Sequence, residues 1–312
     1  MNHAAVGVTV ATLWSSPDRT RPSDTAALLD SPDIGAWIAA MSPDEQTGSG
    51  VDTQLLLGDP VLVDEARPDG WSRVVVPGQA APDLDPRGYP GWIRTAQLTT
   101  PSPGETTPSP GEAPLVVDAL TTALRDAPGG RVVLPGVMLG TLLSPAGAAT
   151  GGWLPVGVAG RTLWAPAGDL APVPDRPPTG DEVVAVARRL RGAVYVWGGL
   201  STPGIDCSGL VHLVWRRLGV RLPRDAHDQA AATTPVAPGT ERPGDLYFFA
   251  RPGRPVHHVG IVVTPEDRVL LHASAGLHQV VEEPMPQDRV DTLTGIHRLV
   301  VSDGTTVRTA ID

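Results

Sequence analysis

Two proline-rich segments constrain this 312-residue chain more than any other feature, because such polar, proline-rich sequence does not pack into a core. The first repeats TPSPGE in tandem around residues 100–114 and is typical of a semi-stiff, extended spacer. The second is APVPDRPPTGD at residues 171–181. Three blocks remain, and we therefore expect a domain over 1–100, a linker over 101–113, a domain over 114–172, a linker over 173–180, a domain over 181–303 and a tail over 304–312.

The composition of the chain excludes several classes of partner. A formal charge of -10 provides no basic field, so neither a nucleic acid nor a membrane surface is an expected partner. The only cysteine, Cys207, cannot form an internal disulfide, so the fold does not depend on an oxidising compartment. The first residues lack the charged start of a signal peptide, and no apolar run reaches the roughly 18 residues of a membrane span. We expect a cytoplasmic protein, unless a leader was removed before residue 1.

The first two blocks contain a faint internal repeat. The pattern GW-x-x-V-x-V occurs at residues 70–76 and again at 152–158, and the pattern W-x5-L occurs at 92–98 and again at 164–170. Two matches in the same order predict a duplicated small β module, with short strands broken by Gly, Pro and Asp turns. The Trp-centred strands and the GYPGW turn at 88–92 resemble bacterial SH3-like modules.

Two capping patterns predict helices. In the first block Ser31 is the expected N-cap and Pro32 the first residue of a helix whose apolar face would carry Ile34, Trp37, Ile38 and Met41. In the third block Thr179 and Glu182 have the spacing of a capping box, and an apolar helix face follows them. The runs GDLYFFA, HHVGIVV and RVLLHASAG then read as consecutive antiparallel strands. Helices followed by a sheet indicate an α+β plan for this block.

Cys207 lies where a turn becomes an amphipathic helix. Asp206 is the expected N-cap, Gly219 the expected stop, and the buried face would carry Leu210, Val211, Val214 and Leu218. In the first turn, the free backbone N–H groups and the positive end of the helix dipole favour a thiolate, which is the nucleophilic form of cysteine. The same N–H groups are placed to bind an oxyanion. The alternative is that Cys207 is a small core residue.

Two of the eight histidines are candidates for the base that a nucleophilic cysteine needs. His258 and His272 both lie inside apolar strands, 14 residues apart, where an imidazole without a function is costly. In a strand-turn-strand they would share one face, directly opposite each other if the loop has an odd residue count, with Cβ atoms roughly 5 Å apart. His257 should point to the other face. The alternatives are a pair of satisfied core histidines or a zinc site, which would need further ligands. Surface or supporting positions are expected for His3, His212, His227, His278 and His297.

Six motifs of the third block occur in the order and approximate spacing of the NlpC/p60 cysteine peptidases, which this block resembles over its whole length. They are YVWGG at 195–199, DCSGLV at 206–211, LPRDAHDQ at 222–229, PGDL at 243–246, HVGIVV at 258–263 and LHA at 271–273. The resemblance implies a papain-like α+β catalytic domain, preceded here by two small SH3-like β-barrels. With the SH3-like blocks it extends to the γ-D-glutamyl-L-diamino acid endopeptidases that recycle cell-wall peptides.

The resemblance and the residues point to the same chemistry. Cys207 would attack the γ-carbonyl of D-Glu, and His258 would take and return the proton. His272 would hold the His258 ring in the right tautomer, as the third member of a triad. The oxyanion would be bound by the N–H of Cys207 and by the Tyr195 hydroxyl, unless Tyr195 is an ordinary packing residue.

The resemblance also implies a pocket for the substrate's amine. Asp225 matches the position that binds the free amine of an N-terminal L-Ala, with Ser208 as helper and Arg224 beside it, although Asp225 could instead cap a short helix. Asp59 in LGDP and Tyr89 in GYPGW would complete the pocket from the first block. Asp59 departs from the pattern, since the longer Glu is expected there. Blocking the amine would leave a buried carboxylate unpaired, which discriminates against acylated peptides.

We therefore expect a cytoplasmic, monomeric cysteine endopeptidase that needs no cofactor and no metal. Its partner would be a murein tripeptide or tetrapeptide with a free N-terminal L-Ala. One alternative is a secreted wall hydrolase acting on polymeric peptidoglycan, which would need an export signal. Another is a non-catalytic protein whose SH3-like pair binds peptide while the third block is inert.

Overall fold

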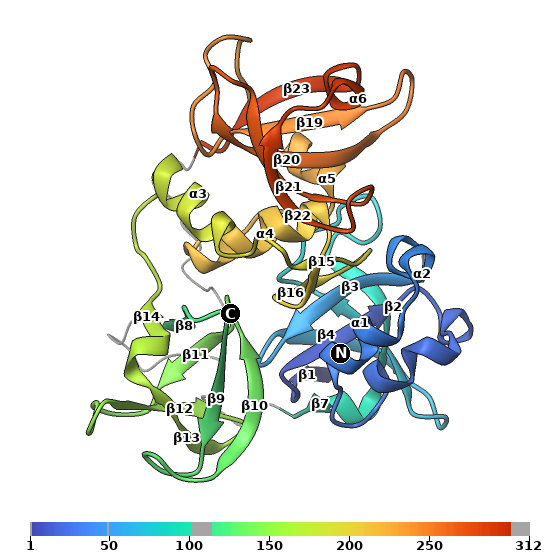
Figure 1. The fold of residues 1–312 in the computed structure, drawn as a ribbon. Coiled ribbons are helices and arrows are strands. Elements are labelled where there is room, and N and C mark those ends of the chain that lie inside the picture. The colour runs from blue at the N-terminus through green and yellow to red at the C-terminus, as the bar shows by residue number, and fades with distance from the viewer. Residues whose placement is uncertain (1, 49, 101–113, 301–312) are drawn as a thin grey trace.

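Residues 2–48, 50–100 and 114–300 are described by a computed structural model. They form three β-sheets, built from residues 2–99, 115–172 and 194–298 (Figure 1). The predicted linker at 101–113 and the predicted tail at 304–312 lie outside the described residues.

The first two sheets have the same strand order. The first runs β3-β2-β6-β5-β4-β1-β7 and the second runs β10-β9-β13-β12-β11-β8-β14, so each strand of one corresponds to a strand seven places later in the other. The predicted duplication of a β module is thereby confirmed. The first sheet contains β1 (Asn2–Val6), β2 (Val10–Trp14), β3 (Val51–Leu56), β4 (Pro60–Ala66), β5 (Trp71–Val76), β6 (Tyr89–Arg94) and β7 (Leu98–Thr99). The second contains β8 (Leu115–Val117), β9 (Thr121–Arg125), β10 (Val132–Met138), β11 (Leu142–Pro145), β12 (Trp153–Val158), β13 (Arg161–Pro166) and β14 (Leu170–Pro172).

Between β2 and β3 the first module inserts two 3-10 turns, η1 (Pro17–Arg19) and η2 (Pro22–Ala27), and two helices, α1 (Ile34–Ala40) and α2 (Pro43–Thr47). The predicted helix is present, but its predicted N-cap is wrong. Asp33 caps α1, because its carboxylate accepts the Ala36 N–H at 2.9 Å, so the helix begins two residues after Pro32. The buried side chains of α1 are Ile34, Trp37 and Ile38, as expected from their spacing.

The third sheet has nine strands in the order β16-β17-β15-β22-β21-β20-β19-β23-β18. Helix α3 (Gly180–Arg188) precedes it and begins with the predicted capping box of Thr179 and Glu182. The remaining elements are β15 (Val194–Tyr195), β16 (Leu200–Ser201), β17 (Gly204–Ile205), α4 (Cys207–Arg217), α5 (Ala226–Ala231), β18 (Thr234–Pro235), β19 (Leu246–Ala250), β20 (Val256–Thr264), β21 (Val269–Ser274), β22 (Gln279–Pro284), α6 (Gln287–Val290) and β23 (Leu293–Arg298). α4 packs against β20, which places the start of α4 beside the centre of the sheet.

One hydrophobic core joins the first module to the third. Trp14 and Trp37 of the first module belong to the same buried cluster as Ile205 and Leu210 around α4. The two parts approach closely, since a Cβ added to Gly198 would lie 2.6 Å from a methyl carbon of Val51. The contact between them is therefore a built interface rather than a flexible junction.

The second module binds the opposite end of α4. Asp118 pairs with Arg217 of α4 at 2.7 Å and with Arg189 at 2.8 Å. Arg216 also donates from Nε to the Gly140 carbonyl at 2.8 Å. The second module thus supports the C-terminal end of α4.

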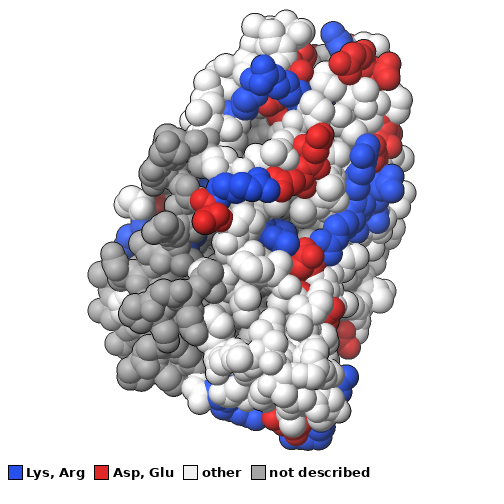
Figure 2. All heavy atoms as spheres, turned by 90° about the vertical axis from the view of Figure 1, so that its left-hand side faces the viewer, with Lys and Arg blue, Asp and Glu red and all other residues white. Residues whose placement is uncertain are grey.

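Acidic and basic side chains are interspersed over the described part of the face in Figure 2, without an extended patch of one sign there. Among the described residues, the helices are too short or too polar to cross a lipid bilayer.

Candidate active site

Cys207 is the first residue of α4, as its sequence context predicts. Asp206 is the N-cap, and its Oδ1 accepts the Gly209 N–H at 2.6 Å. This bond turns the backbone at the residue before the cysteine and leaves the early N–H groups of the helix directed toward the sulfur side. The Cys207 side chain is buried.

The surroundings of the Cys207 sulfur favour the thiol in the free protein. Burial, followed by the negative charge of Asp206, raises the pKa of Cys207 to about 12. The backbone N–H groups of Val259 and Ser208 interact with the sulfur and act in the opposite direction. The helix terminus favours the thiolate, as expected, but burial outweighs that effect in the free protein. A base must take the proton.

His258 on β20 and His272 on β21 lie together, and β20 contacts the sulfur at Val259. Nε2 of His258 and Nδ1 of His272 are 2.8 Å apart, and both rings are buried. Val259, which contacts the sulfur, directly follows His258. Among the described residues no hydrogen bond joins the sulfur to either ring, which is common before substrate tightens a catalytic site.

The two histidines share one face of the sheet, as predicted, but they are not directly opposite. β20 and β21 pair Ile261 with Leu271, and continuing that register places Ser274 opposite His258. His258 and His272 are therefore diagonal neighbours, offset by two residues. Their rings contact each other edge to face, with 78° between the ring planes. His257, one residue away, is exposed on the other face, as predicted.

Glu283 on β22 is a further member of this group that sequence reasoning missed. Its Oε1 lies 3.1 Å from Nε2 of His272. An ionised carboxylate only accepts hydrogen bonds, so Nε2 of His272 carries a proton and Nδ1 of His272 accepts. The Nε2 of His258 must then be the donor, which leaves the lone pair of its Nδ1 free. One carboxylate thereby assigns the tautomers of both rings.

Both imidazoles are neutral at neutral pH. Burial, followed by the proximity of His272 and Arg289, lowers the pKa of His258 well below its usual value. Burial also lowers the pKa of His272, against the hydrogen bond that His272 donates to Glu283, which raises it. A neutral His258 with a free lone pair is suited to act as a general base.

Tyr195 lies close to the sulfur in a buried position on β15. Burial, followed by the charge of Cys207, raises the pKa of Tyr195. The hydroxyl therefore keeps its proton and is available as a hydrogen-bond donor beside the nucleophile.

A second group of polar side chains lies between the first module and α5. The Tyr89 hydroxyl donates to Oδ2 of Asp225 at 3.1 Å. Asp225 occupies the N-cap position of α5, but within the described ranges its side chain caps no N–H of that helix. The alternative that Asp225 serves as a helix cap is therefore not supported, and its carboxylate faces the first module instead.

Asp52 on β3 belongs to the same group and was also missed. Burial, followed by the charge of Asp225, raises the pKa of Asp52 to about 7. Burial and then Asp225 likewise raise the pKa of Tyr89. Two carboxyl groups and a phenol thus form an acidic cluster across the two modules, whose negative charge a cation would offset.

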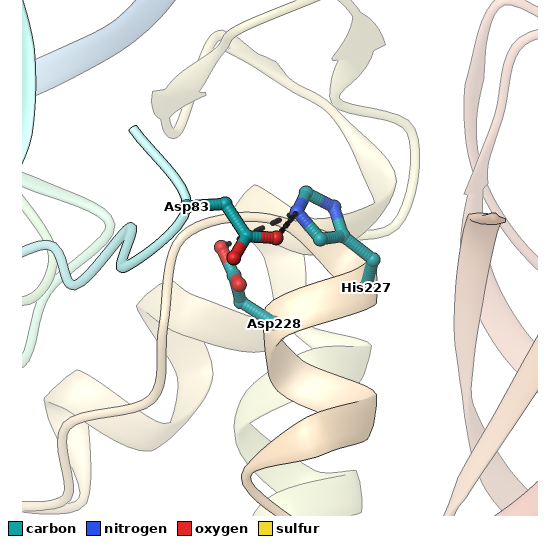
Figure 3. Close-up of side chains that lie close together, drawn as sticks. All are labelled: Asp83, His227 and Asp228. Atoms are coloured by element: carbon teal, nitrogen blue, oxygen red, sulfur yellow. Dashed lines mark ion pairs between the residues drawn. The ribbon is translucent and has the colours of Figure 1, made fainter. Parts of the chain in front are cut away.

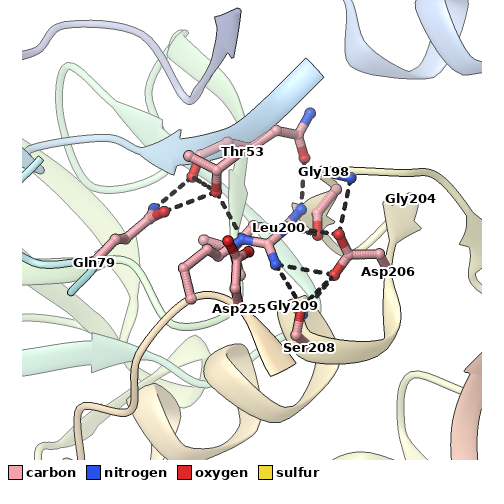
Figure 4. Close-up of polar contacts among 12 residues, drawn as sticks. Thr53, Gln79, Gly198, Leu200, Gly204, Asp206, Ser208, Gly209 and Asp225 are labelled. Atoms are coloured by element: carbon pink, nitrogen blue, oxygen red, sulfur yellow. Dashed lines mark hydrogen bonds and ion pairs between the residues drawn. The ribbon is translucent and has the colours of Figure 1, made fainter. Parts of the chain in front are cut away.

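The placement of Arg224 corrects its predicted role in binding substrate. Its five N–H donors are all used within the protein (Figure 4). Nε donates to Thr53 Oγ1 at 2.7 Å, Nη1 to Asp206 Oδ1 at 3.0 Å and Ser208 Oγ at 2.9 Å, and Nη2 to Asp206 Oδ2 at 2.8 Å and the Gly199 carbonyl at 3.2 Å. Arg224 therefore fixes the start of α4 against β3. Ser208, between Arg224 and Cys207, is buried in the same network.

The prediction that Asp59 lines the amine pocket is wrong. Its Oδ1 pairs with Nη2 of Arg216 at 2.5 Å, and its Oδ2 accepts the Leu56 N–H at 2.9 Å. Arg216 lies nine residues along α4 from Cys207, or about 14 Å at 1.5 Å per residue. Asp59 therefore stabilises the far end of α4, and Asp52 is the first-module carboxylate near Asp225.

Known proteins resemble the chain over nearly its whole length. Residues 192–295 match the NlpC/P60 family. The chain is 33% identical over 269 residues to the gamma-D-glutamyl-L-lysine dipeptidyl-peptidase of Bacillus subtilis, covering 84% of this chain and 87% of that protein. It is 31% identical over 270 residues to the protein of the same name from Bacillus cereus, covering 83% and 80%. A crystal structure of an NlpC/P60 family protein from Bacillus cereus matches with a TM-score of 0.85 at 27% identity, covering 96% and 99%.

These likenesses define the class of protein: the fold is that of the NlpC/P60 proteins. The chain belongs to the NlpC/P60 family, and it is a cysteine peptidase.

Proposed function

We propose that the chain hydrolyses the γ-D-Glu-(diamino acid) bond of free murein tripeptides or tetrapeptides that carry an N-terminal L-Ala, as a step in cell-wall peptide recycling. The observation that carries the proposal is the acidic cluster of Asp52, Tyr89 and Asp225, which lies where the first module meets the catalytic domain. The two named Bacillus relatives, which are gamma-D-glutamyl-L-lysine dipeptidyl-peptidases, support the γ-D-glutamyl bond as the target.

In this proposal Cys207 is the nucleophile and His258 the base. As the substrate carbonyl approaches, the thiol proton moves to Nδ1 of His258 and the sulfur bonds to the γ-carbonyl carbon of D-Glu. The Cys207 N–H and the Tyr195 hydroxyl donate to the oxyanion. The imidazolium then protonates the leaving amine of the diamino acid. Water, deprotonated by His258, hydrolyses the thioester and regenerates the thiol.

His272 and Glu283 are proposed to position and stabilise the base. In the neutral state they hold the His258 proton on Nε2, so the lone pair of Nδ1 faces the thiol. When His258 becomes charged, the negative charge of Glu283 acts through His272 and lowers the energy of the imidazolium. This contribution matters because burial disfavours both the thiolate and the imidazolium.

Selectivity for a free amine follows from the charge of the pocket. An ammonium group between Asp52 and Asp225 would offset their negative charge and donate hydrogen bonds to both. An N-acetyl group carries no charge and gives the two carboxyl groups neither a positive charge nor the three N–H donors of an ammonium group. Losing those interactions should give at least about 100-fold discrimination.

We further propose that the two seven-stranded sheets are SH3-like modules, since their Trp-containing strands and common strand order fit such modules. The cytoplasm as compartment and a monomeric state are proposals that accompany the choice of small, soluble peptides as substrate. Cell fractionation tests the first, and size-exclusion chromatography with light scattering tests the second.

One assay tests the function. Free and N-acetylated L-Ala-γ-D-Glu peptides, ending in L-lysine or meso-diaminopimelate, are incubated with the protein and with Cys207→Ala. Cleavage at the γ-D-Glu bond of the free peptides only, abolished by Cys207→Ala, is the expected result. Equal cleavage of free and acetylated peptides would overturn the amine pocket. Preferential release of fragments from polymeric peptidoglycan would favour a wall hydrolase instead.

A further inference from the structure

Three potential metal ligands meet at a different point between the first module and α5. Asp83 lies in the loop between β5 and β6, and His227 and Asp228 lie in the first turn of α5. Their side chains point toward one another (Figure 3). Nε2 of His227 is 3.9 Å from Asp83 Oδ2 and 3.6 Å from Asp228 Oδ2, and one ligand atom from each residue lies within 4.8 Å of the others.

Asp228 provides an independent indication that a cation belongs there. Its side chain is only 6% exposed, yet its carboxylate accepts no hydrogen bond from any described residue. It borders a cavity of about 340 Å³ between the loop at 77–88 and α5, whose other charged side chain is Arg87. Arg87 pairs with Asp64 and Asp85. A carboxylate with so little exposed surface and no hydrogen-bond donor from the described residues is poorly solvated, and a bound cation compensates for that.

We propose that Asp83, His227 and Asp228 bind one divalent transition-metal ion of the Zn²⁺ class. One imidazole nitrogen and two carboxylate oxygens are ligands that Zn²⁺ accepts, with the fourth position left to water. Tetrahedral ligands about 2.1 Å from Zn²⁺ are about 3.4 Å apart. The two distances from His227 exceed this by only a few tenths of an ångström. Ca²⁺ fits less well, because it prefers six to eight oxygen ligands.

The ion would join the loop between β5 and β6 to α5, and both of these elements adjoin the acidic cluster. The loop that carries Asp83 leads into Tyr89, and α5 begins immediately after Asp225. Metal binding would therefore fix the first module against the catalytic domain at the edge of the acidic cluster. The consequence for substrate rests on the proposed function, whereas the metal site itself does not. The site departs from the expectation that the protein holds no metal.

Zinc titration of the full-length chain tests the proposal. The Cys207→Ala variant is used as background, because it removes the thiol as a competing ligand and makes the result independent of peptidase activity. After treatment with a chelator and buffer exchange, ZnCl₂ binding is measured by calorimetry at neutral pH. The expected stoichiometry is one Zn²⁺ per chain. In this background His227→Gln and Asp228→Asn should each weaken binding at least about tenfold, since even the outer partners of metal ligands contribute 10–100-fold.

His3→Gln is the matched control, because His3 is an exposed histidine on β1 away from the cluster, and it should bind as the background does. Thermal unfolding gives a second measurement. Zn²⁺ should raise the melting temperature of the Cys207→Ala chain and of its His3→Gln variant, but not that of its His227→Gln variant. Equal zinc affinity with and without His227 would overturn the site, and so would the absence of binding, which would leave only ion pairs of a protonated His227.

Discussion

The Nε2 atom of His258 and the Nδ1 atom of His272 lie 2.8 Å apart in a buried part of the sheet, with Glu283 on the far side of His272. Because each ring has one donor and one acceptor when neutral, the Glu283 carboxylate that accepts from His272 leaves the free lone pair of His258 on Nδ1. His258 directly precedes Val259, whose backbone N–H contacts the Cys207 sulfur.

Replacing Glu283 by Gln should lower kcat with little change in KM. The amide keeps the size of the side chain but removes the charge that stabilises the His258 imidazolium, so we expect a loss of roughly 10- to 100-fold in kcat, as for other orienting partners. Loss of the negative charge that raises the pKa of His272 should also shift the acidic limb of the pH profile to lower pH. Steady-state kinetics across a pH series measures both effects.

Glu282→Gln is the matched control for this substitution. Glu282 is the preceding residue, but it pairs with Arg188 at 2.7 Å and Arg191 at 3.3 Å. Its replacement should leave kcat and the pH profile unchanged. Similar kinetics for the two variants would contradict a role of Glu283 in positioning the base.

The raised pKa of Asp52 predicts a stability that falls as pH rises. With a pKa of about 7 in the folded protein and 3.8 as its ordinary value, Asp52 binds more protons folded than unfolded between these limits. The folded state therefore carries no penalty from Asp52 below about pH 4 and the full penalty, a few kcal/mol, above about pH 7. Asp52→Asn should flatten this slope and raise the free energy of unfolding at neutral pH.

The same substitution should raise KM for peptides with a free N-terminal amine, because the pocket loses one carboxylate. Urea unfolding at several pH values measures the gain in stability of Asp52→Asn, and peptide kinetics measures the rise in KM. Asp30→Asn, which replaces an exposed aspartate of the same module, is the control and should change neither quantity. A stability gain without any change in KM would place Asp52 outside the amine pocket.

The parts of the site that depend on local pattern were predictable from the sequence. Asp206 as a cap places Cys207 at a helix start, and the period of two residues puts His258 and His272 on one face. The roles of Asp59 and Asp52 could not be separated from the sequence. Asp52 lies on β3 and Asp59 three residues after its end, and their partners, Arg216 and Asp225, are more than 150 residues away. Such pairing is decided by how the modules dock, which no local pattern encodes.

Burial was the second kind of information that the sequence lacked. Arg224 follows a proline in a polar stretch and resembles a surface residue, yet it is fully buried with its five donors satisfied. Glu283 follows another glutamate, and only the register of β21 and β22 shows that one faces His272 and the other faces the arginines of the α3 region.

Removing the Arg224 guanidinium should strongly destabilise the fold. Arg224→Met leaves the Asp206 carboxylate without its main cationic partner at the start of α4, and breaking a buried pair in this way typically costs about 3–5 kcal/mol. Arg224→Lys keeps the charge but has three donors rather than five, so it should lose less. Arg176→Met, which breaks an exposed pair with Glu182, is the control and should change the free energy of unfolding little. Urea unfolding distinguishes these cases, and a loss below 1 kcal/mol for Arg224→Met would show that Arg224 does not hold the two modules together.

Replacing Tyr195 by Phe should lower kcat by about 100-fold while KM changes little, because an oxyanion donor acts mainly in the transition state. The ring remains and still fills its buried position, so the free energy of unfolding should change by less than about 1.5 kcal/mol. Tyr247→Phe is the matched control: the Tyr247 hydroxyl is buried on β19 without a hydrogen-bond partner among the described residues, so its loss should leave kcat unchanged and stability the same or higher. If Tyr195→Phe retains full kcat, the backbone N–H of Cys207 must stabilise the oxyanion without the phenol, and Tyr195 would be a packing residue of β15.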